Sequence, residues 1–151
     1  MLTQLYIENF VLVEQLTIDF KTGLNIFTGE TGAGKTIIIS ALNAVLGERV
    51  TVDLIRTGQE KAVITGMFTV DAPSVGEILR EAGISIGSGD EILLQREIQQ
   101  NGKHICRING RPVTLSMLSD IGRSLIDIHG QHQHQSLLSS QVQLHLLDRF
   151  G

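Results

Sequence analysis

The octapeptide GETGAGKT at residues 29–36 constrains the fold of this chain more than any other feature. It matches the pattern G-x-x-x-x-G-K-[ST] at every defined position, a pattern that requires a strand before it and a helix after it. Leu24–Phe27 is predicted to be that strand, and Ile37–Leu46, which is apolar nearly all round, is predicted to be a helix buried against a sheet and ended by Gly47. The sequence therefore predicts the strand–loop–helix unit of a P-loop nucleotide-binding protein.

The residue types in this loop suit phosphate binding. Gly29, Gly32 and Gly34 let the backbone wrap closely, so that successive N–H groups point into one concavity, and the start of the helix adds its partial positive charge. Lys35 can reach the β- and γ-phosphates, and Thr36 can give its hydroxyl to Mg²⁺. A guanine-specific Asn-Lys-x-Asp motif is absent from the sequence, which argues against a small GTPase, whereas a kinase of small molecules stays open on this loop alone.

The composition predicts a globular domain with a core. The chain has 151 residues, of which 42% are hydrophobic and 19% charged. Twelve Lys and Arg against sixteen Asp and Glu give a net charge of -4 without a basic block, which gives no support for autonomous nucleic-acid binding. No apolar run is long enough for a membrane span, and we expect a cytoplasmic protein. The single Cys106 is predicted to be a small buried side chain on a strand.

The remaining pattern indicates a mixed α/β fold with an antiparallel portion. Further strands are predicted at Leu5–Ile7, Leu16–Phe20, Ala62–Val70, Glu91–Ile98, His104–Ile108 and Leu125–Ile128, and further helices at Val75–Ala82, Leu115–Ile121 and after Ser139 or Ser140. Asn101-Gly102 is the strongest hairpin signal, and a second Asn-Gly at residues 109–110 leads toward the helix at Leu115.

Part of the equipment for hydrolysis is missing from the sequence. A P-loop ATPase needs an acidic residue at the end of an apolar strand to hold Mg²⁺. The nearest candidate is Asp127, which has no neighbouring glutamate to orient water. Residues 138–141, LSSQ, lack the glycines that a signature loop needs, and we interpret them as a helix cap. Either the rest of the site lies beyond Gly151, or this chain does not hydrolyse nucleotide.

The polar run HGQHQHQ at residues 129–135 allows three interpretations. Three histidines can bind a metal ion, but no second cluster of Cys, Asp or Glu offers itself at ligand spacing. A glutamine amide placed beside the nucleotide could join the Mg²⁺ shell or orient water. The third interpretation is a solvated loop without a role, and the residues alone leave the last two equally open.

Two blocks of the sequence resemble a known family. The first block resembles the N-terminal segment of SMC-like ATPase heads. It consists, in this order, of ENF (Glu8–Phe10), a strand ending in Asp19-Phe20, the segment GLNIFTGETGAGKT and a helix ending in LGER (Leu46–Arg49). The form GETGAGKT resembles the RecN family of bacterial DNA repair proteins in particular, and LIDIHGQHQHQSLL (Leu125–Leu138) is similar to the RecN segment that contains the Q-loop. The resemblance spans nearly the whole chain, and both blocks agree in order and spacing.

This resemblance implies an α/β P-loop NTPase of ABC/SMC head type. Residues 1–151 would form the N-terminal lobe of the head, with a mixed sheet around the P-loop helix and an antiparallel β portion. The C-terminal lobe would bring the signature loop, the Walker B acid and the catalytic glutamate. Neither that lobe nor the coiled coil has a counterpart in this chain, which accounts for the missing catalytic groups.

The resemblance also implies roles for individual residues. The nucleotide-binding residues would be Gly29, Glu30, Thr31, Gly32, Ala33, Gly34, Lys35 and Thr36. Lys35 and Gln131 would be catalytic, and Thr36 and Gln131 would hold Mg²⁺; Gln133 and Gln135 are weaker choices for the Q-loop glutamine. Asn9 or Phe10 would lie near the nucleotide base.

The leading hypothesis is an ATP-binding lobe of a RecN-like ATPase that repairs DNA double-strand breaks by recombination, in the bacterial cytoplasm at the nucleoid. The implied cofactors are ATP and Mg²⁺. The implied partners are the C-terminal lobe of the same head, a second head in a homodimer and, through the assembled protein, DNA. ATP binding would close the heads and hydrolysis would open them, and the lone chain should be nearly inactive. The alternatives are a nucleotide-dependent interaction module without hydrolysis and a small-molecule kinase.

Overall fold

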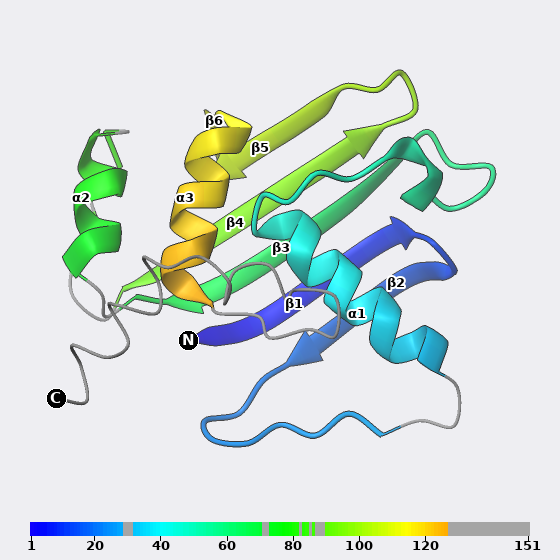
Figure 1. The fold of residues 1–151 in the computed structure, drawn as a ribbon, viewed down its shortest axis with the longest axis horizontal. Coiled ribbons are helices and arrows are strands. Elements are labelled where there is room, and N and C mark those ends of the chain that lie inside the picture. Colours follow the sequence, from blue (N-terminus) through cyan, green and yellow to red (C-terminus); the bar gives the residue numbers. More distant parts are fainter. Residues whose placement is uncertain (29–31, 71–72, 82, 85, 87–89, 127–151) are drawn as a thin grey trace, which may run out of the picture.

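A computed structural model describes residues 1–28, 32–70, 73–81, 83–84, 86 and 90–126 of the chain (Figure 1). Its centre is one antiparallel sheet with the strand order β2-β1-β3-β4-β5-β6. The strands are β1 (Leu2–Phe10), β2 (Val13–Asp19), β3 (Lys61–Thr69), β4 (Glu91–Gln99), β5 (His104–Ile108) and β6 (Arg111–Val113).

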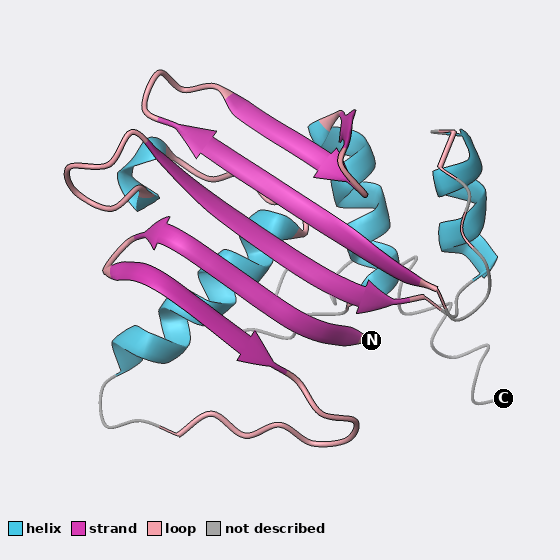
Figure 2. Cartoon of the chain, turned by 180° about the vertical axis from the view of Figure 1, so that it is seen from behind, coloured by secondary structure: helices cyan, strands magenta, loops and turns pink. Residues whose placement is uncertain are grey.

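Helices cover one face of this sheet. The helices are α1 (Gly32–Val45), α2 (Pro73–Glu81) and α3 (Leu115–Leu125), with a short 3₁₀ turn η1 at Val52–Leu54. Figure 1 shows α1 and α3 in front of the strands, and Figure 2, from behind, shows the opposite face with no helix before it. The sheet therefore has one covered face and one open face, a common arrangement for antiparallel sheets.

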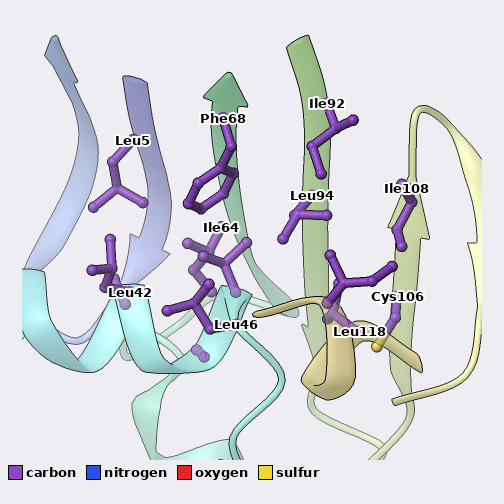
Figure 3. Packing of buried hydrophobic residues seen from close by; sticks show 14 of the residues in the cluster. Leu5, Leu42, Leu46, Ile64, Phe68, Ile92, Leu94, Cys106, Ile108 and Leu118 are labelled. Atoms are coloured by element: carbon purple, nitrogen blue, oxygen red, sulfur yellow. The ribbon is translucent and has the colours of Figure 1, made fainter. Parts of the chain in front are cut away.

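The alternation of side chains along the central strands explains this arrangement. In β3 and β4 every second residue is buried, so apolar side chains face the helices and mostly polar ones face solvent. Ile64, Phe68 and Leu94 on the covered face meet Leu42 of α1 and the other core residues (Figure 3). Complete burial of side chains of this kind stabilises a fold by roughly 1.5–3 kcal/mol each.

Both Asn-Gly pairs form hairpin turns. The hairpin predicted at Asn101-Gly102 is confirmed, whereas the pair at residues 109–110 also forms a hairpin, with a strand that was not predicted. Gly102 has a φ of 80° in the β4–β5 hairpin. Asn109 and Gly110 have φ of 48° and 78°, as a type I′ turn requires, and they lead into the unpredicted strand β6 before α3 starts. Leu125, predicted to start a strand, is instead the last residue of α3, and the rest of that predicted strand lies outside the described residues.

The strand predicted at Leu24–Phe27 is wrong. Those residues form no strand, and the exposed fractions of Leu24, Ile26 and Phe27 are 86%, 73% and 41%. A strand needs a neighbouring strand to pair with its N–H and C=O groups, and none of the described strands lies beside this segment. Without it, the described sheet is antiparallel throughout and lacks the parallel part that a mixed sheet would have.

Candidate nucleotide-binding site

The predicted phosphate loop runs into the first turn of α1. The helix begins at Gly32, five residues before the predicted start, so Gly34, Lys35 and Thr36 belong to its first turns and are exposed. Gly29, Glu30 and Thr31 lie outside the described residues. The structure therefore places the second half of the motif at a helix N-terminus, where the sequence predicted a loop.

The chemistry of this helix end favours an anion. The first N–H groups of any α-helix have no intrahelical partner, and they carry about half a positive charge together. The first turn of α1 contains no acidic residue to oppose that charge, and Lys35 adds a full one. A Cβ built on Gly34 would meet no atom within 4 Å, so the backbone there is open to close approach by a ligand. The donors present fit a phosphate chain with its Mg²⁺.

The far end of α1 is fixed in the core. Ala41, Leu42, Ala44, Val45 and Leu46 are all buried, whereas the stretch from residue 34 to 36 is exposed. The helix that the sequence predicted to be buried against a sheet is thus buried mainly from Ala41 onward. The exposed end with Lys35 and Thr36 therefore extends from a helix that is held at its other end.

Gly47 ends α1 in a Schellman motif, as the sequence predicted for a helix stop. Its φ is 92°, its N–H donates to the Ala44 carbonyl at 3.2 Å, and the N–H of Glu48 donates to the Asn43 carbonyl at 3.0 Å. A Cβ on Gly47 would lie 2.5 Å from the backbone nitrogen of Ser119. Helix α3 therefore packs directly on the end of α1, at a distance that only glycine allows.

The turn between β1 and β2 is joined to the segment that follows α1. The N–H of Val11 donates to the Leu54 carbonyl at 2.7 Å, and the N–H of Arg56 donates to the Asn9 carbonyl at 2.9 Å. The Arg56 guanidinium also lies 3.4 Å from the Glu14 carboxylate. Phe10, the last residue of β1, is completely buried and so offers no exposed ring surface. Asn9 is half-buried. That Asn9 or Phe10 lies near the nucleotide base stays a prediction.

Among the described residues, several groups with shifted pKa values lie on the neighbouring strands β4 and β5. A hydrogen bond from Gln99, at 2.6 Å, and the nearby charges of Lys61 and Arg107 lower the pKa of Glu97 despite its partial burial. Cys106 is buried on β5, which confirms the prediction of a small buried side chain on a strand, and this burial raises the pKa of its thiol. A polar depression of about 480 Å³ lies at the hairpin end of the sheet, lined by Glu60, Lys61, Glu97, Gln99, Gln100 and Asn101. It contains no residue of the phosphate loop.

Several predicted site residues lie outside the described part of the chain. They are Asp127, Gln131, Gln133, Gln135 and the histidines of the 129–135 run. Among the residues that the structure does describe, no group of three or more His, Cys, Asp or Glu could hold a metal ion. None of the described helices has the length and apolar character needed to cross a bilayer.

Sequence reasoning missed Arg96. This side chain is buried in β4 with 1% of its surface exposed, and it contacts the end of α1. The available signal was its position in an alternating strand, at a place where an apolar residue would be expected.

Comparisons with known proteins agree with this geometry. The AAA domain family matches residues 4–146. The chain is 48% identical, over its whole length, to the DNA repair protein RecN of Halalkalibacterium halodurans, and 44% identical to RecN of Bacillus subtilis. It spans 27% and 26% of the length of these two relatives.

The fold is also that of solved ATPase heads. A structure from work on ATP-driven dimerisation and DNA-stimulated activation of SMC ATPases superposes with a TM-score of 0.66, at 21% identity, and covers 99% of both chains. The SMC head domain of Thermotoga maritima superposes with a TM-score of 0.61 at 26% identity, over 79% of this chain and 41% of that one. The lobe is thus an SMC-head-like P-loop ATPase lobe with a mostly antiparallel sheet.

Proposed function

The chain belongs to the RecN family of DNA repair proteins, and we propose that it is the ATP-binding N-terminal lobe of an ATPase head that acts in recombinational repair of DNA double-strand breaks. One observation carries this proposal: the motif GETGAGKT leads into the exposed first turn of α1, in a chain that matches RecN proteins over its whole length. In this proposal the lobe corresponds to residues 1–151, and the protein acts in the bacterial cytoplasm at the nucleoid.

In this proposal the residues of the loop bind the triphosphate of ATP. The backbone N–H groups of residues 29–34 surround the phosphates, and Lys35 offers its ammonium group to their β- and γ-oxygens. The Thr36 hydroxyl and the Gln131 amide oxygen are ligands for Mg²⁺, and Gln131 also orients water for attack. When bound, Mg²⁺ supplies neutralising charge for the phosphate oxygens.

The proposed first partner is the C-terminal lobe of the same head. Leu24, Ile26 and Phe27 form an exposed, extended apolar segment directly before the loop, and Ile39 on the uncovered half of α1 is 47% exposed. Apolar surface of this kind, next to a binding motif, commonly marks an interface. We infer that a strand of the C-terminal lobe pairs with the segment Leu24–Phe27 and gives it the neighbour that the described sheet lacks.

The proposed second partner is another head, so that the assembled protein is a homodimer that contacts DNA. One of the solved structures with this fold comes from SMC ATPases, for which ATP-driven dimerisation and DNA-stimulated activation are described. By the same scheme, ATP binding brings two heads together and hydrolysis lets them separate, so the nucleotide acts as a switch on association.

ATP turnover by the full-length protein tests this proposal. Lys35→Ala should lower kcat by roughly 100-fold or more, as removal of one charge-stabilising group does in other active sites. Lys103→Ala is the matched control, because Lys103 is an exposed lysine in the β4–β5 turn. Equal turnover by wild type and Lys35→Ala would refute the proposal, and transfer of phosphate to a small-molecule acceptor instead of water would favour a kinase.

A further inference from the structure

Arg96 is a charged side chain in the middle of an apolar core. It projects from β4 on the same face as Ile92, Leu94 and Ile98, and 1% of its surface is exposed. Removing an ion from water is costly, and burial lowers the pKa of this guanidinium. Apolar residues that replace buried ions often leave stability unchanged or improve it. Overall stability therefore does not explain an arginine at this position.

The hydrogen bonds of Arg96 join β4 to the C-terminal end of α1, to the residues just after it and to the neighbouring strand β5. Its Nη1 donates to the Ala44 carbonyl at 3.2 Å and to the Glu48 carbonyl at 2.9 Å. Its Nη2 lies 3.4 Å from Nδ1 of His104 on β5, which accepts because a guanidinium can only donate. The last carbonyls of a helix lack intrahelical partners and carry partial negative charge, so a cation is favourable there.

Arg96 contacts the C-terminal end of α1, which is the end of this helix that packs in the described core. From Ala41 to Val45 the helix is buried except at the half-buried Asn43, whereas Lys35 and Thr36 near its start are exposed. Lys35 and Ala44 are nine residues apart, which is about 14 Å along a helix axis. A tilt of about 5° at the Ala44 end would move the Lys35 end by about 1.2 Å over that length. Misplacement by about 1 Å can slow a catalysed reaction roughly 100-fold.

We propose that Arg96 is a positioning residue for the phosphate loop: it fixes the C-terminal turn of α1 on the sheet and thereby sets where Lys35 and Thr36 meet the nucleotide. This inference rests on the proposed function. The guanidinium suits the role because it reaches two carbonyls and an imidazole at once. An ammonium group is a point charge without this planar fork of donors.

The test compares Arg96→Lys and Arg96→Met with Arg107→Lys in the full-length protein. Arg107 is the matched control because it lies on β5, is 30% exposed and pairs with Glu97 on the open face of the sheet. For each variant, the measurements are KM and kcat for ATP, the unfolding temperature, and hydrogen exchange of the amides in α1.

We expect KM for ATP to rise about threefold or more in Arg96→Lys, and about tenfold in Arg96→Met, following the loss of charge-assisted hydrogen bonds. Arg107→Lys should stay within twofold of wild type. Amide exchange should become faster in the first half of α1 without a general loss of protection. If Arg96→Met does not fold, Arg96→Lys decides, because a smaller folded fraction lowers the apparent kcat and leaves KM unchanged.

Two outcomes overturn this inference in distinguishable ways. Activity that depends on Lys35, with KM unchanged in every folded Arg96 variant, would refute the role of Arg96 and leave the proposed function intact. Wild-type protein without ATP turnover, indistinguishable from Lys35→Ala, would refute the proposed function and the role of Arg96 together.

Discussion

The contact between α1 and α3 predicts opposite effects for two glycine-to-alanine substitutions. Gly122 in α3 lies against the end of α1, where an added Cβ would be 3.0 Å from the Leu46 carbonyl carbon and closer still to its oxygen. Gly76 in α2 has no atom within 4 Å of such a Cβ. Both positions are helical, so both substitutions gain the same kind of helix propensity.

The magnitude follows from these two terms. Replacing glycine by alanine inside a helix stabilises a protein by roughly 0.5–1 kcal/mol where space is available, which is the expectation for Gly76→Ala. Gly122→Ala gains the same amount but forces the backbones of α1 and α3 apart, and overpacking of this kind costs about 1–3 kcal/mol. The two variants should therefore differ in free energy of unfolding by about 1–3 kcal/mol, with Gly122→Ala the less stable.

Urea unfolding of the chain, followed by circular dichroism, measures this difference directly. On heating, the two variants should unfold about 2–4 °C apart for each kcal/mol of difference. Equal stabilisation by both substitutions would refute the reasoning, because α3 would then yield to an added methyl group without cost and could not hold the end of α1.

Three further predictions concern stability. Thr114→Ala removes the oxygen that caps the start of α3 and should lower the free energy of unfolding in urea by about 1 kcal/mol. Thr51→Ala, at a turn without a side-chain cap, should be neutral. Equal costs for the two substitutions would contradict the capping role of Thr114. Val11→Gly should cost about 1–2 kcal/mol less than Val13→Gly, because Val11 has a φ of 53° that only glycine adopts freely; a larger cost at Val11 would refute the strain. Because the pKa of Glu97 is lowered in the folded state, its stabilising effect is complete above pH 4.5 and disappears as pH falls through the folded-state pKa. The urea midpoints of wild type and Glu97→Gln should therefore converge in acid. A difference between the midpoints that stays constant with pH would contradict this.

Local signals in the sequence were sufficient for much of the fold. Asn101-Gly102 and Gly47 determined a turn and a helix end through their own backbone preferences, and both are where the sequence predicted them. The strands predicted at Ala62–Val70 and Glu91–Ile98 are likewise present as β3 and β4. Such features depend on neighbouring residues alone, so a single sequence reveals them.

Features that depend on distant parts of the protein could not be predicted in this way. Leu24–Phe27 has the composition of a strand, but no described strand lies next to it. The resemblance implied that Asn9 or Phe10 lies near the nucleotide base, but it could not reveal that Phe10 bridges to Ile55 and is completely buried. Strand β6 escaped prediction because it is three residues long and contains a proline.

The candidate site was predictable to the extent that its motif is local. A helix follows the glycine-rich segment, as the pattern required, but it already includes Lys35 and Thr36. The support behind that helix was not predictable, since Arg96 reaches Ala44 across 52 positions of sequence. A lone polar residue in an alternating strand does not reveal which helix it will contact.

The most direct test of the central claim is ATP turnover by the 151-residue chain, alone and mixed with the remaining C-terminal portion of the full-length protein, each with a Lys35→Ala control. We predict activity only in the mixture, and its loss with Lys35→Ala, which would establish this chain as the phosphate-binding lobe of a divided ATPase head. Turnover by the lone chain at a rate that the C-terminal portion does not change would show a complete active site within these residues and contradict the account.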